Sequence, residues 1–109
     1  MKSITISIAD FSKNPAGRTR VDGPFSAEAF RDDILIPALN ANDKVEVNLD
    51  GTIGIAASFL QEAFAGLMAD FDYPVLADKL TITGLRTYQF LIKRYMEDAA
   101  VKEAIFLFA

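Results

Sequence analysis

The fold is decided by the stretch GTIGIAASFLQEAFAGL, which occupies residues 51–67. It follows a strand-like run at residues 45–49, where apolar and polar residues alternate as in a half-buried strand. Apolar residues then recur at the spacing of one helix face, namely Leu60, Ala63, Phe64, Leu67, Met68 and Phe71. A strand, a short loop and an amphipathic helix in succession are typical of an α/β fold.

Ser58 stands immediately before this helix face, and Gln61 follows three residues later. That spacing is the signature of a capping box, in which a hydroxyl and an amide satisfy backbone N–H groups at a helix start. We therefore expect Ser58 to cap the N-terminus of the helix, at the end of the loop that begins with Asp50. A serine in that place lies beside free N–H groups and the positive end of the helix dipole.

The residues before this stretch predict a strand, a loop and a helix. Isoleucines alternate with polar residues over residues 4–8, as in a half-buried strand. Residues 10–23 contain one proline and two glycines and predict a loop, within which residues 18–21 are compatible with a short second strand. Ser26 then predicts a helix cap. Pro37, a residue that costs about 3 kcal/mol inside a helix, predicts a kink or an end just before it.

The residues after the stretch predict one more strand and one more helix. Residues 72–74 break the helix that starts near Ser58, and residues 80–83 read as a short strand. A last helix has one apolar face over residues 88–99 and is expected to weaken near Val101. Four consecutive apolar residues come at the end of the chain: Ile105, Phe106, Leu107 and Phe108.

Strands and helices therefore alternate along the chain. This order predicts a small single-domain α/β layer fold over residues 1–109, with a mixed β-sheet, parallel strands joined by right-handed crossovers, and about three helices. Sites for ligands and partners in such folds lie at the carboxyl ends of strands. The loop from Asp50 to Ser58 leaves the sheet at such an end, so we expect functional residues there.

The composition excludes several kinds of chemistry. The chain has no Cys and no His, which removes thiolate nucleophiles, disulfides, most zinc sites and imidazole acid–base catalysis. The net charge of −4 and the pI of about 4.7 leave no overall electrostatic footprint for nucleic acid. No apolar run approaches the roughly 18 residues of a membrane span, and the N-terminus does not form a signal peptide. We expect a cytoplasmic protein with no metal, no cofactor, and no nucleic-acid or membrane partner.

Several stretches of the sequence together resemble a known family. They are GR at residues 17–18, DGPFSAEAFR at residues 22–31, LIPAL at residues 35–39, VNLDG at residues 47–51 and SFLQEAFAGL at residues 58–67. Over about residues 3–100 the chain resembles the small STAS-like domains of unknown function from bacteria and phages. It departs at Ala27 and Ala65, where the family pattern favours glycine, and at Ala56, where another small residue is favoured.

That family is similar in turn to the anti-sigma-factor antagonists and to the STAS domains of sulphate transporters. In the antagonists the corresponding loop carries an Asp-Ser-Ser-Gly-Leu motif, whose second serine is phosphorylated by a partner kinase of the histidine-kinase-like ATPase type. Ser58 occupies the place of that serine, which implies a phospho-switch and an ATPase kinase as partner. The sequence departs from the motif at Ala56 and Phe59, which replace its Asp and its Gly.

Seven residues are candidates for partner binding or for the switch: Ser58, Phe59, Glu62, Gly66, Asp50, Arg18 and Asp22. Phe59, Glu62 and Gly66 fall on one flank of the helix, where we expect an exposed docking surface. In the alternative, Phe59 packs under the loop that precedes the first helix. We expect residues 18–23 to fold back over the sheet edge or the Ser58 loop. Ser58 itself is a helix cap only, a phosphorylation site, or an unmodified contact residue.

Three classes of function remain open. The favoured one is a non-enzymatic regulatory module that docks on a protein through the loop before Ser58 and the helix after it. The second is a phage or mobile-element inhibitor that blocks a host protein through its acidic surface. The third is a small-ligand binder or an enzyme that uses Asp50 and Glu62, because paired carboxylates can carry out acid–base chemistry.

The apolar end of the chain predicts self-association. A strand or an amphipathic helix would bury about half of the residues Ile105, Phe106, Leu107 and Phe108, and a small domain has little core to cover the others. Contiguous exposed apolar surface marks interfaces. We therefore expect this tail to contact a second copy in a two-fold dimer.

Overall fold

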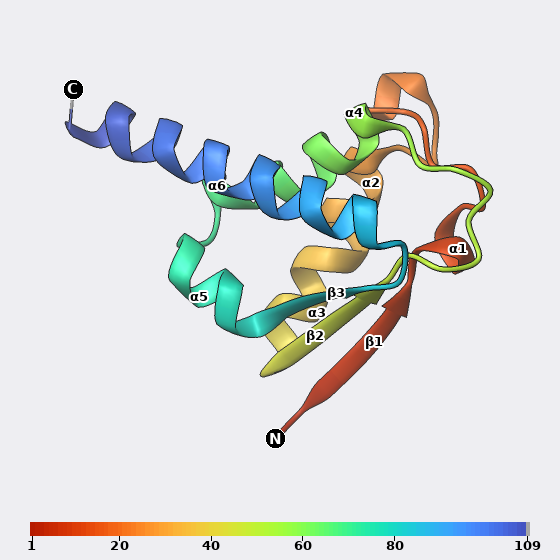
Figure 1. Cartoon of the computed structure of the whole chain (residues 1–109), viewed down its shortest axis with the longest axis horizontal. Coiled ribbons are helices and arrows are strands. Elements are labelled where there is room, and N and C mark those ends of the chain that lie inside the picture. The colour runs from red at the N-terminus through yellow and green to blue at the C-terminus, as the bar shows by residue number, and fades with distance from the viewer. Residues whose placement is uncertain (109) are drawn as a thin grey trace.

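The computed structural model describes residues 1–108, with side chains up to Ile105 (Figure 1). The strands are β1 (Ser3–Ser7), β2 (Lys44–Asn48) and β3 (Leu80–Thr83). The α-helices are α1 (Ile8–Phe11), α2 (Ala27–Phe30), α3 (Ile36–Ala41), α4 (Ala57–Leu60), α5 (Tyr73–Lys79) and α6 (Arg86–Phe108). The strand expected at residues 80–83 is confirmed, and the other two lie within one residue of their expected bounds.

The three strands form one sheet in chain order, β1-β2-β3, and both pairings are parallel. The predicted α/β class is confirmed. The described part of the sheet is wholly parallel instead of mixed, because helical crossovers join each strand to the next, and the helical segments outnumber the three expected. The short strand expected at residues 18–21 is wrong, since Arg20–Asp22 form a 3₁₀ turn.

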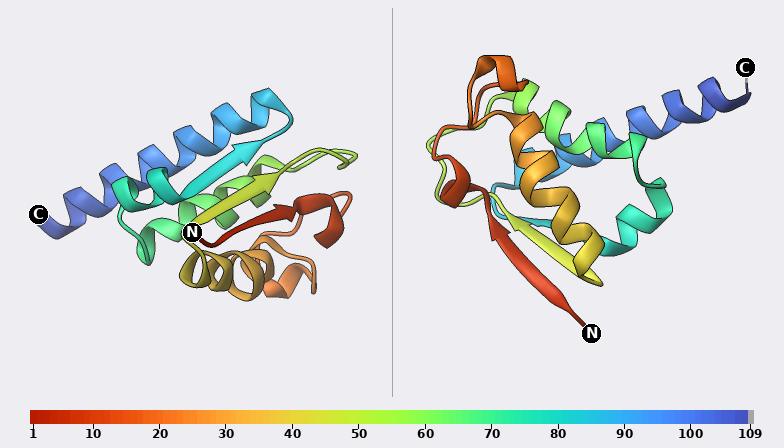
Figure 2. Two further views of the ribbon diagram at one scale, coloured as in Figure 1. Left: turned by 90° about the horizontal axis from the view of Figure 1, so that it is seen from below. Right: turned by 180° about the vertical axis from the view of Figure 1, so that it is seen from behind.

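The sheet has one apolar face and one polar face. The register aligns Val47 with Ile82 in one row and Glu46 with Thr81 in the neighbouring row, whose side chains point to the opposite side. Val47 is fully buried, whereas Thr81 is exposed. The apolar rows therefore carry the core, and the left view of Figure 2 looks onto the polar side of the sheet.

The first long helical run covers residues 27–41. Ser26 caps it, as expected, and the Ser26 hydroxyl oxygen accepts a hydrogen bond from the Ala29 N–H at 3.2 Å. The run does not end before Pro37. Instead, Arg31–Leu35 form a π-helical segment between α2 and α3. The wider turn lets the helix continue through a proline, which has no N–H to donate.

The second helical run covers residues 57–69 and begins earlier than expected. It consists of α4, the π-helical segment Gln61–Ala65 and the 3₁₀ turn Gly66–Ala69. The N-cap residue is Ala56, and Ser58 lies inside the first turn, so the expected cap by Ser58 is wrong. The N–H of Ala56 donates to the carbonyl oxygen of Pro15 at 2.9 Å, which ties the helix start to the loop after α1.

A cluster of phenylalanine rings explains this earlier start. Phe59 is fully buried, and its ring lies 6.4 Å from the ring of Phe11 and 6.0 Å from the ring of Phe30. Phe30 in turn lies 6.4 Å from Phe64. Burying such rings contributes strongly to a core, so the helix includes Phe59. The expected exposed position of Phe59 is wrong. The alternative, packing under residues 10–23, agrees with the contact between its ring and that of Phe11.

The structure also differs from the expectation in its C-terminal third. α5 was not predicted; it begins directly after its N-cap Asp72 and has Pro74 in its first turn, where proline is favourable. α6 does not weaken near Val101 but continues to Phe108, and its last turns extend beyond the other elements (Figures 1 and 2).

Within the described residues, no helix combines the length and the apolar character needed to cross a membrane.

Candidate functional site

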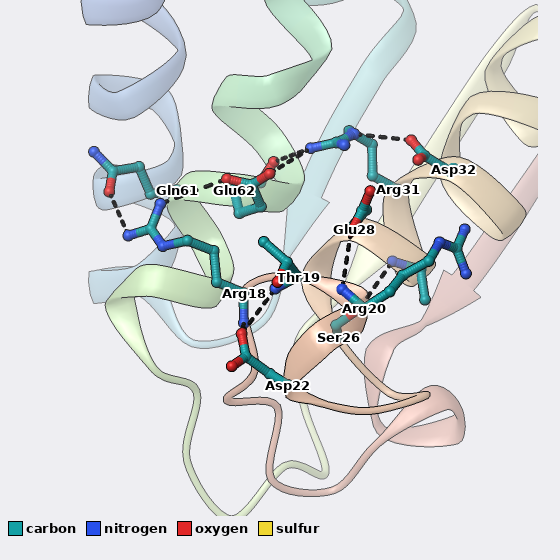
Figure 3. A network of polar contacts seen from close by, with 11 residues as sticks. Arg18, Thr19, Arg20, Asp22, Ser26, Glu28, Arg31, Asp32, Gln61 and Glu62 are labelled. Atoms are coloured by element: carbon teal, nitrogen blue, oxygen red, sulfur yellow. Dashed lines mark hydrogen bonds and ion pairs between the residues drawn. The ribbon is translucent and has the colours of Figure 1, made fainter.

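Arg18 joins the loop after α1 to the second helical run (Figure 3). Its Nη2 donates to Gln61 Oε1 at 3.1 Å, and its Nη1 lies 3.5 Å from Glu62 Oε2. Gln61 and Glu62 follow Ser58 by about one helical turn. The expectation that residues 18–23 fold back toward the Ser58 region is therefore confirmed, although these segments are far apart in the sequence.

Asp22 shapes this loop from within. Its Oδ2 accepts hydrogen bonds from the backbone N–H groups of Arg18 and Thr19, each at 3.0 Å, and Thr19 and Asp22 form a capping box. The bonds from the Thr19 and Arg18 N–H groups lower the pKa of the exposed Asp22 carboxyl below its usual value. Asp22 thus holds Arg18 in place, and its carboxylate is engaged with the loop's own backbone.

Further contacts attach the loop to α2. The Ala27 N–H donates to the carbonyl oxygen of Gly17 at 2.8 Å. The Arg20 N–H donates to Glu28 Oε1 at 2.9 Å, and the Arg20 guanidinium pairs with Asp33 at the same distance. The loop therefore lies against both helical runs, with Arg18 facing one and Arg20 facing the other (Figure 3).

Arg31 joins the two helical runs directly, and the sequence interpretation missed it. Its Nη1 donates to the Glu62 carbonyl oxygen at 2.8 Å and to Glu62 Oε1 at 3.2 Å, while its Nε donates to Asp32 Oδ1 at 3.0 Å. The Arg31 side chain is only 14% exposed. Partial burial alone would lower the pKa of Arg31, but the hydrogen bonds to Asp32 and Glu62 outweigh it and raise the pKa.

Gly66 makes room for this arginine. A Cβ atom on Gly66 would overlap Arg31 Nη1 and would lie 3.2 Å from Arg31 Cδ. The expected docking flank of Phe59, Glu62 and Gly66 is therefore wrong, because Phe59 is in the core, Glu62 is paired and Gly66 lies under Arg31. The sequence signal that could have revealed the contact is the combination of an arginine, Arg31, beside the apolar stripe of the first helical run and a glycine, Gly66, inside the second.

Ser58 lies in the first turn of α4 and is half-buried. It shares a helix face with Gln61 and Glu62, which follow it by three and four residues. Within the described residues its hydroxyl has no side-chain or backbone partner, and the N–H groups of Ala57 and Ser58 have no acceptor. Among the described residues, the helix start thus offers free N–H donors and a free hydroxyl, about one turn before the two residues that Arg18 contacts.

Asp50 is not part of this arrangement. It follows β2, and its carboxylate lies so close to Gly84 that a Cβ atom there would be 2.6 Å from Asp50 Oδ1. Glu62 is engaged by Arg18 and Arg31 instead. The two carboxylates have different neighbours, and among the described side chains no group of three or more could hold a metal ion.

Comparison with known protein families shows what the chain is similar to. The sequence pattern of the family described as STAS-like domain of unknown function (DUF4325) matches residues 26–89, more than half of the chain. The matched segment includes Arg31, Asp50, Ser58, Glu62 and Gly66, whereas the Arg18 loop precedes it. No curated protein and no solved structure matches the chain. The chain therefore belongs to the family of STAS-like domains of unknown function.

Proposed function

We propose that this domain is a non-enzymatic regulatory module of the cytoplasm that docks on a protein partner. The docking site is the Ser58 surface, which we define as Arg18, Ala57, Ser58, Gln61 and Glu62. The observation that carries the proposal is the position of Arg18. A loop fixed by its own capping box holds this guanidinium against Gln61 and Glu62, in the turn that follows the helix start.

The chemistry of the Ser58 surface supports binding over catalysis. A serine nucleophile needs a neighbouring base that accepts its proton, and within the described residues no such group contacts the Ser58 hydroxyl. Glu62, the nearest carboxylate along the helix, is occupied by two arginines. Exposed charged and amide groups around a helix start, by contrast, suit recognition of a partner's polar groups.

The same surface suits a switch at Ser58. A kinase of the histidine-kinase-like ATPase type would transfer the γ-phosphoryl group of ATP to the hydroxyl oxygen, releasing ADP and a proton. The phosphate would accept hydrogen bonds from the free N–H groups and would attract Arg18 away from Gln61 and Glu62. It would also repel Glu62. Phosphorylation would thus rearrange the surface on which the partner docks.

Site-specific cross-linking in living cells tests the proposal. A photoreactive phenylalanine analogue replaces the exposed Ala57, and the matched control carries it at the exposed Thr5 of β1, on the polar face of the sheet. We expect Ala57 to give one cross-linked partner, Thr5 to give none, and Ser58→Asp to weaken the Ala57 product. The same product from both positions, or no product from Ala57, contradicts the proposal.

We also propose a homodimer through the projecting end of α6. Ile105 is 62% exposed and Val101 is 58% exposed, on turns that extend past the other elements (Figure 1). The expected contacts of Phe106, Leu107 and Phe108 cannot be compared with the structure, because it describes side chains only up to Ile105. Exposed apolar side chains at the end of a projecting helix support a contact with a second copy.

A further inference from the structure

A groove of about 710 Å³ lies between β3, α5 and α6 and contains none of the residues of the Ser58 surface. We call it the β3–α6 groove; its lining includes Leu80, Ile82, Arg86, Phe90, Lys93 and Met96. Leu80 and Met96 belong to the buried core, whereas Phe90 is 68% exposed. Its volume and apolar lining are those of a binding site.

The groove runs beside a free edge of the sheet, because β3 pairs with β2 and with no other strand in the part of the chain that the structure describes. The Leu49 N–H donates to the carbonyl oxygen of Thr83 at 2.9 Å, so Thr83 directs its backbone groups toward β2. Successive residues of a strand face opposite edges, so the N–H and the carbonyl of Ile82 face outward. Within the described residues neither group has a hydrogen-bond partner. Such an edge is a template for a further strand.

The charges along the groove have one sign. Arg86 and Lys93 line it, and among the residues with described side chains its lining includes no aspartate and no glutamate. Within the described residues neither cation takes part in an ion pair. The groove is thus positive although the whole chain has a net charge of −4. A ligand that fills it gains from carboxylates placed opposite Arg86 and Lys93.

We propose that the β3–α6 groove binds an extended segment of a partner protein that adds to β3 as a fourth strand, and that the side of this segment facing the groove carries both apolar and acidic residues. Its backbone pairs with the N–H and the carbonyl of Ile82. Because every second side chain of a strand points to the same face, the apolar residues that fill the groove and the acidic residues that face Arg86 and Lys93 lie two positions apart. A helix could not pair with Ile82, because its own backbone groups are already bonded. The inference goes beyond the proposed function, since it uses no residue of the Ser58 surface.

A short model peptide tests the inference on the full chain. The probe is an acetylated and amidated peptide in which every second residue is, in turn, valine or glutamate, with threonine at the positions between them, labelled for fluorescence anisotropy. We expect saturable binding, together with slower hydrogen exchange of the Ile82 amide and little change at Thr81, whose N–H already faces β2. A peptide with lysine in place of glutamate, and one whose backbone amides are methylated on one edge, should bind at least about tenfold more weakly.

Charge-reversal variants of the protein test whether the peptide binds in the β3–α6 groove. Lys93→Glu and Arg86→Glu should each weaken binding of the valine–glutamate peptide by about three- to tenfold. The matched control is Arg94→Glu, on the same helix and equally exposed but outside the groove, which should leave the affinity unchanged. Circular dichroism of each variant establishes that the fold is retained.

Several results would overturn the inference. One is the absence of binding by the valine–glutamate peptide, and another is binding that leaves Ile82 exchange unchanged. Equal loss of affinity in Arg94→Glu would place the peptide elsewhere. Dodecanoate that binds in the groove without protecting Ile82, while the peptide fails to bind, would assign the groove to small apolar anions. Protection of Ile82 that grows with protein concentration alone would assign it to a second copy.

Discussion

Arg31 and Gly66 are coupled, because the guanidinium occupies the space where a side chain at position 66 would lie. Helix propensity alone predicts that Gly66→Ala stabilises the chain by about 1 kcal/mol. Here the methyl group would displace Arg31 from the Glu62 carbonyl, so we expect Gly66→Ala to destabilise the protein by about 1 kcal/mol. In an Arg31→Ala background the same change should stabilise it. Urea unfolding of the four proteins measures both effects, and an equal sign in both backgrounds contradicts the coupling.

The hydrogen bonds to Asp22 make stability depend on pH. The Thr19 and Arg18 N–H groups lower the pKa of Asp22 below its usual 3.8. A carboxyl whose pKa is lower in the folded chain stabilises the fold fully above 3.8, and this contribution is lost as the pH falls through the folded pKa. We expect Asp22→Asn to lower the urea midpoint at neutral pH and to make it less sensitive to acid below 3.8.

Asp33 provides the control for this experiment. Its pKa is also lowered, but by the side chain of Arg20 and not by backbone donors. Asp33→Asn should therefore leave the Arg18 loop in place, which hydrogen exchange of the Thr19 amide reports. If Asp22→Asn retains the acid sensitivity of the unmodified chain, the capping box does not contribute as described.

At the scale of elements, the two helical runs begin differently although both contain an early serine. Ser26 caps the first run, whereas Ser58 lies inside the second. We expect Ser26→Ala to cost about 0.5–2 kcal/mol and Ser58→Ala to change stability by less than about 0.5 kcal/mol. Ala56→Asp, which supplies a cap oxygen, should stabilise the chain by about 1 kcal/mol. Thermal unfolding compares the three variants, and a larger loss for Ser58→Ala than for Ser26→Ala contradicts the assignment.

These helix starts show what local sequence can predict. The strands and the Ser26 cap follow from alternation and from one side chain, so their positions were predicted to within a residue. The start of the second run depends on the bond from Ala56 to Pro15 and on the burial of Phe59 against Phe11. These contacts join residues about forty apart in the chain, and no local spacing encodes them.

The residues of the candidate site were likewise predicted only in part. Residues 18–23 were predicted to fold back toward the Ser58 loop because the resemblance was strong in both stretches, and the contacts of Arg18 with Gln61 and Glu62, in the turn after Ser58, agree with this. Arg31 was missed because an arginine beside an apolar stripe is ordinarily a solvated residue. Its role depends on the glycine opposite it, on another helix. α5 was missed because Asp72 and Pro74, read as a helix break, are also the start of the next helix.

At the scale of the whole molecule, the projecting end of α6 should decide the oligomeric state. If Ile105 and the residues after it hold a second copy, removal of residues 105–109 should change the mass in solution from dimer to monomer. Light scattering at several concentrations measures this, and retained circular dichroism shows that the shortened chain folds. An intact chain that stays monomeric at high concentration contradicts the dimer.

The strand order has a consequence for how the chain folds during synthesis. Because β1, β2 and β3 lie in the sheet in the order in which they are made, each new strand joins the exposed edge of those already present. No earlier strand has to move aside, and each crossover is complete before the next strand leaves the ribosome. The sheet is thus extended one strand at a time, from β1 toward β3. Among the described residues, the edge along β3 is the last to form and has no further strand beside it.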